Sequence, residues 1–157
     1  MARRVRDSAR MSMQAAPTTT PLDAFVRGYL HRVVNTRDLT AVDDLVSPSY
    51  RGRGYGWPED VDALRDFYRW QAGSRPDWTI DVQQTVEVAG CVVVRAYAGG
   101  TIADDEQGRP LAAPTQHAVE WMAMYRIENC LITEIEVLAL RERPKADVQA
   151  TDRSRPY

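Results

Sequence analysis

Five side chains in this sequence have the chemistry for acid–base catalysis. They are a histidine, two tyrosines, an arginine and a glutamate within or beside predicted strands: His117, Tyr50, Tyr97, Arg95 and Glu136. An imidazole can act as a general base near neutral pH, and a phenol can donate a hydrogen bond to an oxyanion or an epoxide oxygen. An arginine can orient a carboxylate or an enolate. These groups favour proton transfer in an apolar pocket, and we expect no cofactor and no metal ion.

Each of these residues also has a purely structural interpretation. Arg95 can form a buried ion pair with a strand glutamate, and His117 can stand at the start of a strand beside a loop. The two tyrosines can be core aromatics whose hydroxyls have hydrogen-bond partners. The sequence leaves both interpretations open.

Strand alternation groups some of the candidates by face. Arg95 and Tyr97 share one face of their strand because they are two residues apart. Glu136 lies on the face opposite Val137, which places this reserve carboxylate outside a cavity lined by Val137. A register shift of one residue would reverse these assignments.

Three helices are expected in the first half of the chain. The apolar positions of the first recur with the helical period: Leu22, Phe25, Val26, Tyr29 and Val33. Thr20 is the expected N-cap of this helix, with Pro21 at its first position. A short second helix is expected over 39–46 and a short strand over 49–53. The third helix is expected to begin at Pro58 and to stop by Gly73.

In the second half the apolar residues recur with the period of a strand. Four strands are expected over 78–88, 91–98, 115–127 and 131–140, with a polar loop over 103–114. Helices segregated from an antiparallel run of strands predict an α+β fold. We expect a single domain over 21–141, with flexible tails over 1–20 and 142–157.

Composition narrows the classes of partner. The 157 residues carry a net charge of −2, so no overall positive field would gather nucleic acid. No apolar run approaches the roughly 18 residues that would span a bilayer, so we expect no membrane partner. The basic N-terminus lacks the apolar segment of a secretory signal, and we expect a cytoplasmic protein. Cys91 and Cys130 lie in apolar stretches and are expected to be reduced and buried.

Five segments carry a resemblance to a known family. They cover 29–50, 57–68, 75–80, 86–101 and 124–138, and they include N-T-R-D-L, R-P-D-W, V-V-V-R-A-Y-A-G-G-T and M-Y-R-I-E-N-C-L-I. In order and spacing the chain resembles the SnoaL-like polyketide cyclases of the nuclear transport factor 2-like superfamily. The resemblance implies a cone-shaped, curved antiparallel or mixed sheet packed against three N-terminal helices, with a central pocket.

The resemblance also implies where a site would lie. The superfamily's isomerases carry a pocket acid at the register of Ala123, which implies that this face points inward. Relatives that hydrolyse epoxides line their pocket with Arg-x-Asp where this chain has Arg95-x-Tyr97, and Tyr50 matches their first-strand tyrosine. The residues expected to converge are Tyr50, Arg95, Tyr97, His117 and Trp121.

Three departures from the family pattern affect the expected chemistry, and one of them is Ile102, which follows Thr101 where the family has a histidine. The histidine that follows the first-strand tyrosine in such cyclases is replaced by R-G-R-G over 51–54, and the last-strand aspartate is replaced by Val137. An aromatic wall would suit a planar or polyene-like substrate. The residues expected to bind it are Trp121, Trp57, Trp78, Tyr29, Phe25, Phe67 and Val137.

Three functions are compatible with this pattern. The leading hypothesis is a cofactor-independent tailoring enzyme of secondary metabolism that cyclises a hydrophobic polyketide-like or terpenoid-like intermediate by acid–base chemistry or epoxide opening. The alternatives are a non-catalytic member that binds a small ligand or a protein, and an epoxide hydrolase. Glu120, Met122 and Met124 alternate outward, and we expect a homodimer through this outer sheet face.

Overall fold

A computed structural model describes residues 21–105 and 107–143 of the chain. The expected N-cap Thr20, the tail over 1–20 and most of the tail over 142–157 lie outside the described residues. The last strand extends to Glu142, one residue beyond the expected end of the domain.

Three α-helices precede most of the sheet, as predicted. Helix α1 (Leu22–Leu30) continues into a π-helical turn (His31–Asn35) and is followed by α2 (Thr40–Leu45). Helix α3 (Val61–Ser74) begins after Asp60, whose carboxylate accepts a hydrogen bond from the Ala63 amide at 2.9 Å. This cap satisfies one of the amides left unpaired at a helix start and so defines where α3 begins.

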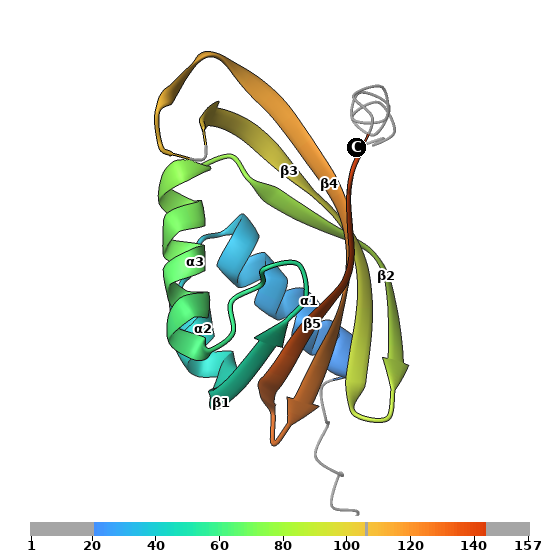
Figure 1. Cartoon of the computed structure of the whole chain (residues 1–157). Helices are drawn as coiled ribbons and strands as arrows, with labels where there is room; N and C mark the ends of the chain where they lie inside the picture. The colour runs from blue at the N-terminus through green and yellow to red at the C-terminus, as the bar shows by residue number, and fades with distance from the viewer. Residues whose placement is uncertain (1–20, 106, 144–157) are drawn as a thin grey trace, which may run out of the picture.

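The sheet has five strands in the order β1-β5-β4-β3-β2. Their bounds are β1 Val46–Arg53, β2 Thr79–Val88, β3 Cys91–Asp104, β4 Pro110–Glu128 and β5 Leu131–Glu142. Strand β1 is parallel to β5, and the other neighbours are antiparallel. The sheet is therefore mixed and open, and it curves around the helices (Figure 1). The predicted α+β fold is confirmed.

Two tight turns join consecutive strands of the sheet. Ala89-Gly90 links β2 to β3 and Asn129-Cys130 links β4 to β5, and all four residues have positive φ. Two-residue turns of this kind match the twist of the strands they join. Cys91 is buried as expected, but the burial predicted for Cys130 is wrong, because its place in a hairpin turn exposes it to solvent.

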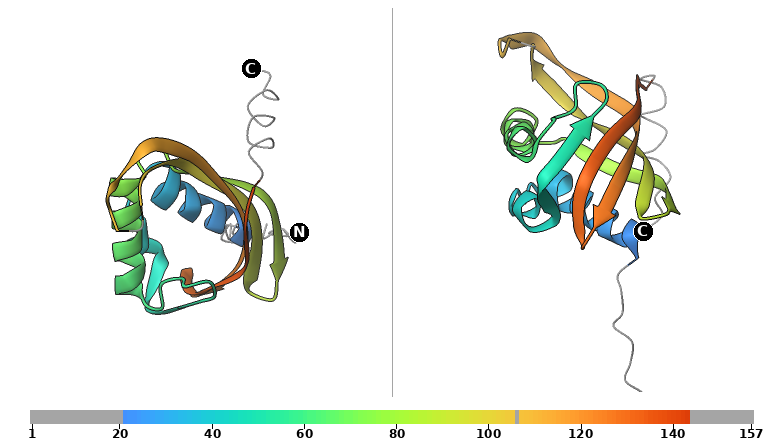
Figure 2. Two further views of the ribbon diagram at one scale, coloured as in Figure 1. Left: turned by 45° about the horizontal axis from the view of Figure 1, so that its top comes forward. Right: turned by 60° about the horizontal axis from the view of Figure 1, so that its bottom comes forward.

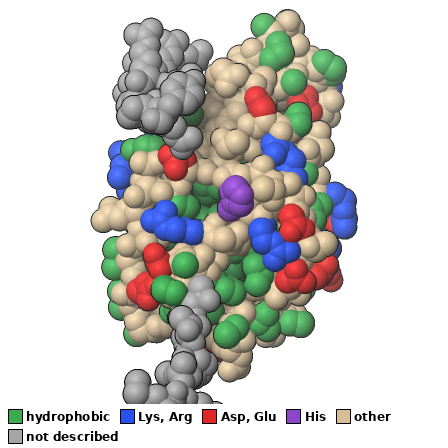
Figure 3. Space-filling view, turned by 180° about the vertical axis from the view of Figure 1, so that it is seen from behind, with side chains coloured by type: hydrophobic (Ala, Val, Ile, Leu, Met, Phe, Trp, Pro, Cys, Tyr) green, Lys and Arg blue, Asp and Glu red, His purple; other side chains and the backbone are tan. Residues whose placement is uncertain are grey.

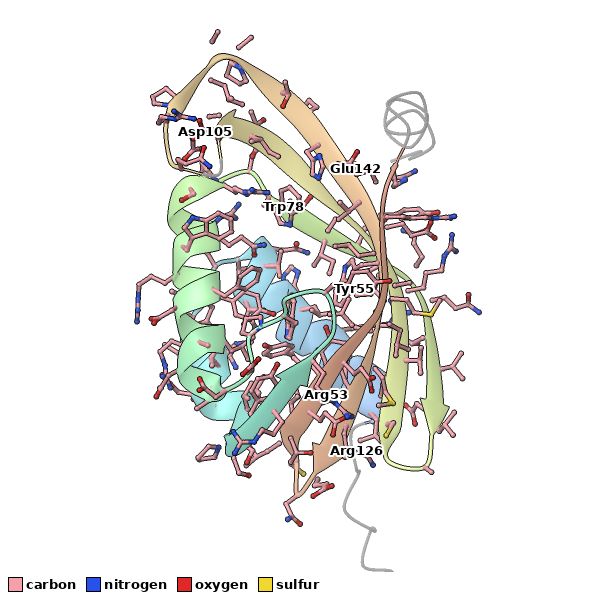
Figure 4. The ribbon with its side chains drawn as sticks, in the orientation of Figure 1. Arg53, Tyr55, Trp78, Asp105, Arg126 and Glu142 are labelled. Carbon is pink, nitrogen blue, oxygen red and sulfur yellow. The ribbon has the colours of Figure 1, made fainter. Side chains whose placement is uncertain are left out.

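The polar loop predicted over 103–114 is wrong in extent. Strand β3 continues to Asp104 and β4 starts at Pro110, so the connection is short. The Asp105 carboxylate accepts hydrogen bonds from the amides of Gln107 and Arg109, both at 2.9 Å, and so closes the turn. The resulting two-stranded arm extends beyond the rest of the sheet near the C-terminal end of α3 (Figure 2), with Asp105 at its tip (Figure 4).

The core lies between the inner face of the sheet and the helices. On β3 the buried side chains are the small and aliphatic ones at alternate positions: Val92, Val94, Ala96 and Ala98. On β4 and β5 the buried set is Trp121, Ala123, Tyr125, Ile127, Ile132, Ile135 and Val137. Burial of this stripe against α1 and α3 contributes most of the driving force for folding.

The outer surface mixes charges of both signs. Glu120 and Met122 lie on the outer face of the sheet, opposite Trp121, as the alternation predicted. A dimer through this face stays a prediction. On the side seen in Figure 3, acidic and basic side chains are interspersed with apolar ones.

Gly52 lies where β1 packs closely against the β1–α3 connection. A Cβ atom at this position would lie 1.8 Å from the Pro58 carbonyl oxygen and 2.5 Å from the Tyr50 hydroxyl. Gly52→Ala should therefore lower the free energy of unfolding by about 2–3 kcal/mol, because the backbone must move. Urea unfolding followed by circular dichroism measures this change.

Gly73→Ala is the matched control, because nothing lies within 4 Å of a Cβ atom in this turn of α3. It should raise the stability by about 0.5 kcal/mol through helix propensity. Equal stability of the Gly52→Ala protein and the wild type would contradict the tight contact.

Candidate functional site

A cavity of about 330 Å³ lies between α3, the β1–α3 connection and the inner face of the sheet. This volume is at the lower end of those that hold small organic ligands. Trp78 and Tyr55, both of which border the cavity, are labelled in Figure 4. Its lining is mostly apolar and aromatic: Leu30, Val34, Tyr55, Gly56, Trp57, Pro58, Phe67, Tyr68, Trp70, Gln71, Arg75, Trp78, Ile80, Ala98, His117, Val119, Trp121, Val137 and Leu140.

All four tryptophans of the chain line this cavity. The rings of Trp57 and Trp121 are nearly parallel, with centroids 6.2 Å apart, and Phe67 lies 5.1 Å from Trp57. These rings form one continuous wall. Such a wall offers a large apolar surface to a planar or extended ligand.

Few polar groups border the cavity. The half-buried His117 ring stacks on Trp78 with centroids 6.1 Å apart. The Arg75 guanidinium lies 4.9 Å from the Trp70 ring and 5.2 Å from the Trp78 ring. Gln71, Tyr68 and the exposed Tyr55 also contribute polar groups, and the described lining contains no carboxylate. Proton transfer in the cavity would therefore depend on His117.

Tyr68 is the residue of α3 that contributes a phenol to the lining of the cavity. Tyr68 is buried, and its hydroxyl accepts a hydrogen bond from Tyr29 at 3.3 Å. Because Tyr29 supplies the proton of that bond, the proton of Tyr68 remains available for donation to a ligand. Burial raises the pKa of Tyr68 to about 12, so the phenol keeps this proton at neutral pH.

Tyr50 holds the aromatic wall and does not line the cavity. Its hydroxyl accepts a hydrogen bond from the Trp57 indole at 2.9 Å and donates one to the Pro58 carbonyl at 3.3 Å. Burial raises the pKa of Tyr50 well above its usual value. Tyr125 is also buried, and its hydroxyl has no hydrogen-bond partner among the residues that the structure describes.

The inward orientation expected for Arg95 and Tyr97 is wrong. In the register of the sheet, Arg95 pairs with Met122 and Tyr97 pairs with Glu120, all on the outer face. The Arg95 guanidinium forms an ion pair with Glu120 and donates a hydrogen bond to the Tyr97 hydroxyl at 2.9 Å. Burying a charged guanidinium costs free energy, whereas burying the valine and alanine side chains is favourable, so the aliphatic face turns inward. The ion pair with a strand glutamate that we gave as the structural interpretation of Arg95 is therefore present, but Arg95 is half-exposed and not buried.

Three other predicted site residues lie away from the cavity. Glu136 forms an ion pair with Arg53 at 3.4 Å on the outer side, in the orientation that alternation predicted. Phe25 packs against the edge of the core, and Tyr29 is buried beneath Tyr68 without lining the cavity. The remaining residues expected at the site line the cavity: His117, Trp57, Trp78, Trp121, Phe67 and Val137.

Sequence reasoning missed the polar contribution of α3. Tyr68, Gln71 and Arg75 follow the buried Leu64 at helical spacing and continue its face to the end of the helix. This spacing was the available signal, because polar residues that extend an apolar helical face must border whatever that face packs against. Leu140 reaches the cavity through a β-bulge in β5 between Val137 and Ala139, which alternation did not predict.

The start of β2 is tied to the sheet at the edge of the cavity. The Asp77 carboxylate accepts hydrogen bonds from the Thr101 hydroxyl at 2.5 Å and from the Thr101 amide at 2.9 Å. The neighbouring Gly100 leaves room for this contact, because a Cβ atom there would lie 2.9 Å from Asp77. The link positions Trp78, which borders both His117 and Arg75.

Neither a metal centre nor a membrane span is found in the described part of the chain. No group of three or more His, Cys, Asp and Glu side chains there could hold a metal ion. No helix over residues 21–105 and 107–143 has the length and hydropathy to cross a bilayer.

The fold and its aromatic cavity are typical of α+β cones that enclose a small-molecule pocket. Residues 26–135 match the model of the SnoaL-like domain. The chain therefore belongs to the SnoaL-like domain family, as the resemblance implied. No curated protein matches the sequence.

Solved structures with this fold come from several bacteria. IdmH of Streptomyces antibioticus, a candidate polyketide cyclase, is 22% identical with a TM-score of 0.63, covering 76% of this chain and 91% of its own. A SnoaL-like polyketide cyclase of Agrobacterium tumefaciens is 16% identical with a TM-score of 0.64, covering 85% and 98%. AclR of Streptomyces galilaeus, a candidate hydroxylase, is 15% identical with a TM-score of 0.63, covering 82% and 91%. At these identities the likeness establishes the fold.

The Asp77 link makes stability depend on pH. Hydrogen bonds from Thr101, chiefly from its hydroxyl and then from its amide, lower the pKa of Asp77 in the folded state. A depressed pKa stabilises the fold above the unfolded pKa, and this stabilisation is lost as pH falls through the folded pKa. Asp77→Asn should therefore lower the melting temperature at neutral pH, and the difference from the wild type should shrink on acidification.

Asp66→Asn controls for the loss of a carboxylate, because Asp66 is exposed on α3 and its ion pair in the described part of the chain is a surface contact with Arg69. It should leave the melting temperature nearly unchanged. A gap between the wild type and Asp77→Asn that stays constant with pH would argue against the charged link.

Proposed function

We propose that this protein is a cofactor-independent tailoring enzyme of secondary metabolism that cyclises a hydrophobic polyketide-like or terpenoid-like molecule by acid–base chemistry. The observation that carries the proposal is the position of His117, which borders an aromatic cavity whose described lining holds no carboxylate. An imidazole beside an apolar pocket is suited to remove a proton from a carbon acid near neutral pH.

The chemistry requires a base and a donor for the developing negative charge. In an aldol-type closure, a ring nitrogen of His117 takes the proton from carbon next to a carbonyl group, and the electron pair moves to the carbonyl oxygen. The Tyr68 hydroxyl, which accepts from Tyr29, donates a hydrogen bond to that oxygen. The enolate carbon then attacks a second carbonyl of the same molecule, and the imidazolium returns its proton to the new alkoxide.

Membership of the SnoaL-like family and the cyclases among the structural neighbours support this reaction class. The neighbours also include a candidate hydroxylase, so the fold alone does not select the reaction. The site residues therefore carry the argument.

A non-catalytic binding protein is the second candidate. The specific observation in its favour is the small number of ionisable groups in the described lining. An epoxide hydrolase is less well supported, because the carboxylate that would activate water is missing from the described lining and Arg95 lies on the outer face.

Removal of the imidazole tests the proposed base. The neutral probe 5-nitrobenzisoxazole loses its ring proton to a base, and the N–O bond then breaks to give a coloured cyanonitrophenolate. The wild type should accelerate this elimination, and His117→Ala should lower kcat/KM by about a hundredfold. The absorbance of the phenolate measures the rate.

The second histidine of the chain provides a matched control. His31 is exposed on the π-helical turn and does not line the cavity. His31→Ala should retain the wild-type rate. Equal rates for the wild type and His117→Ala would remove His117 as the base and favour the binding protein.

The same probe tests the proposed donor. Tyr68→Phe removes the hydroxyl that would stabilise the departing oxygen, and kcat/KM should fall about tenfold. The effect is smaller than for a localised oxyanion, because the nitrophenolate spreads its charge over the ring. Tyr97→Phe removes a phenol on the outer face and should have the wild-type rate. A larger loss for Tyr97→Phe than for Tyr68→Phe would contradict this assignment.

A further inference from the structure

Arg75 is a cation on the cavity wall, and no acid among the described residues pairs with its charge. It is half-buried and lines the cavity at the C-terminal end of α3. Its guanidinium contacts the rings of Trp70 and Trp78. Within residues 21–105 and 107–143, no carboxylate pairs with it and no acceptor receives a hydrogen bond from its side chain.

Eight of the described arginines form ion pairs with acids. Arg32 bonds to Asp38 at 2.7 Å and to Asp44 at 2.8 Å, and Arg65 bonds to Asp43 at 2.6 Å. Arg27, Arg37 and Arg51 have no such partner in the described region either. Arg27 and Arg37 donate hydrogen bonds to backbone carbonyls, Arg51 is exposed, and all three lie outside this cavity. Arg75 therefore lacks the carboxylate or backbone acceptor that most of the described arginines have, and it lines this cavity.

The aromatic contacts hold the guanidinium without satisfying its N–H donors. Contacts with an aromatic face stabilise the positive charge, but a guanidinium carries five N–H groups in a planar fork. A carboxylate matches this fork with two parallel hydrogen bonds. Gln71, one helical turn earlier and also in the lining, adds an amide that can donate to the same anion.

We infer that the substrate carries a carboxylate, and that Arg75 binds this group at the end of the cavity bordered by Trp78. The inference rests on the proposed function, because it names the class of molecule that the same cavity would take. Arg75 and His117 both contact the Trp78 ring, so the carboxylate and the carbon that loses its proton belong to the same end of the substrate. The wall of Trp57, Phe67 and Trp121 takes the apolar remainder.

Binding of a matched pair of ligands tests the inference. The probes are 4-phenylbutanoate and 4-phenylbutanamide, which differ in charge and share their apolar part. Because all four tryptophans line the cavity, quenching of intrinsic fluorescence reports its occupancy. The wild type should bind the acid about tenfold more tightly than the amide, as expected for a charge-assisted hydrogen bond.

Variants of Arg75 separate a binding role from a packing role. Arg75→Gln should remove the preference for the acid while leaving affinity for the amide near that of the wild type. Arg75→Lys should keep part of the preference, because it keeps the charge but loses the fork. Arg69→Gln, on the same helix and paired with Asp66 at the surface, should behave like the wild type.

Two outcomes would overturn the inference: equal wild-type affinities for the acid and the amide, and a preference for the acid that persists in Arg75→Gln. Elimination of the uncharged 5-nitrobenzisoxazole does not require the carboxylate site. A preference for the acid without elimination activity would therefore contradict the proposed base alone, and activity without a preference would contradict the anion site alone.

Discussion

Ala96 of β3 pairs with Trp121 of β4, and this register decides which side chains the cavity receives. Directly paired residues of an antiparallel sheet point to the same face. With Trp121 on the inner face, Ala96 and its alternate neighbours must also face inward, and Arg95 must face outward. The outer face then satisfies Arg95 through Glu120, which also pairs with Arg141. The inner face is left to aliphatic and aromatic groups, and this composition makes the cavity apolar.

An apolar cavity restricts the polar groups that can border it, because each must be satisfied or must await a ligand. Tyr50 is occupied by Trp57 and Pro58, whereas Tyr68 accepts from Tyr29 and keeps its own proton available. Indole rings hold Arg75, and Trp78 also stacks against His117. Polar groups with unused hydrogen-bonding capacity therefore border the same cavity as the aromatic wall, where a ligand with both polar and apolar parts would meet them.

Structures similar to this chain share its fold although their sequences differ widely. Structural neighbours retain the fold at identities of 22% or less. A fold at this level of divergence keeps its layers, because these depend on the pattern of apolar residues and not on their identities. The residues that could hold a substrate here come partly from α3.

The sequence by itself determined the elements and the fold class. The chain displays two periodic patterns directly: the helical spacing from Leu22 to Val33 and the alternation from Trp78 onward. The proline and acids before α3 are a local signal for the start of a helix. Only the tertiary structure decided which face of β3 points inward, because alternation yields two equivalent faces and the pairing with β4 selects one. It also decided that Arg75 borders the same cavity as His117, since these residues lie on a helix and a strand that meet only when the sheet curves around α3.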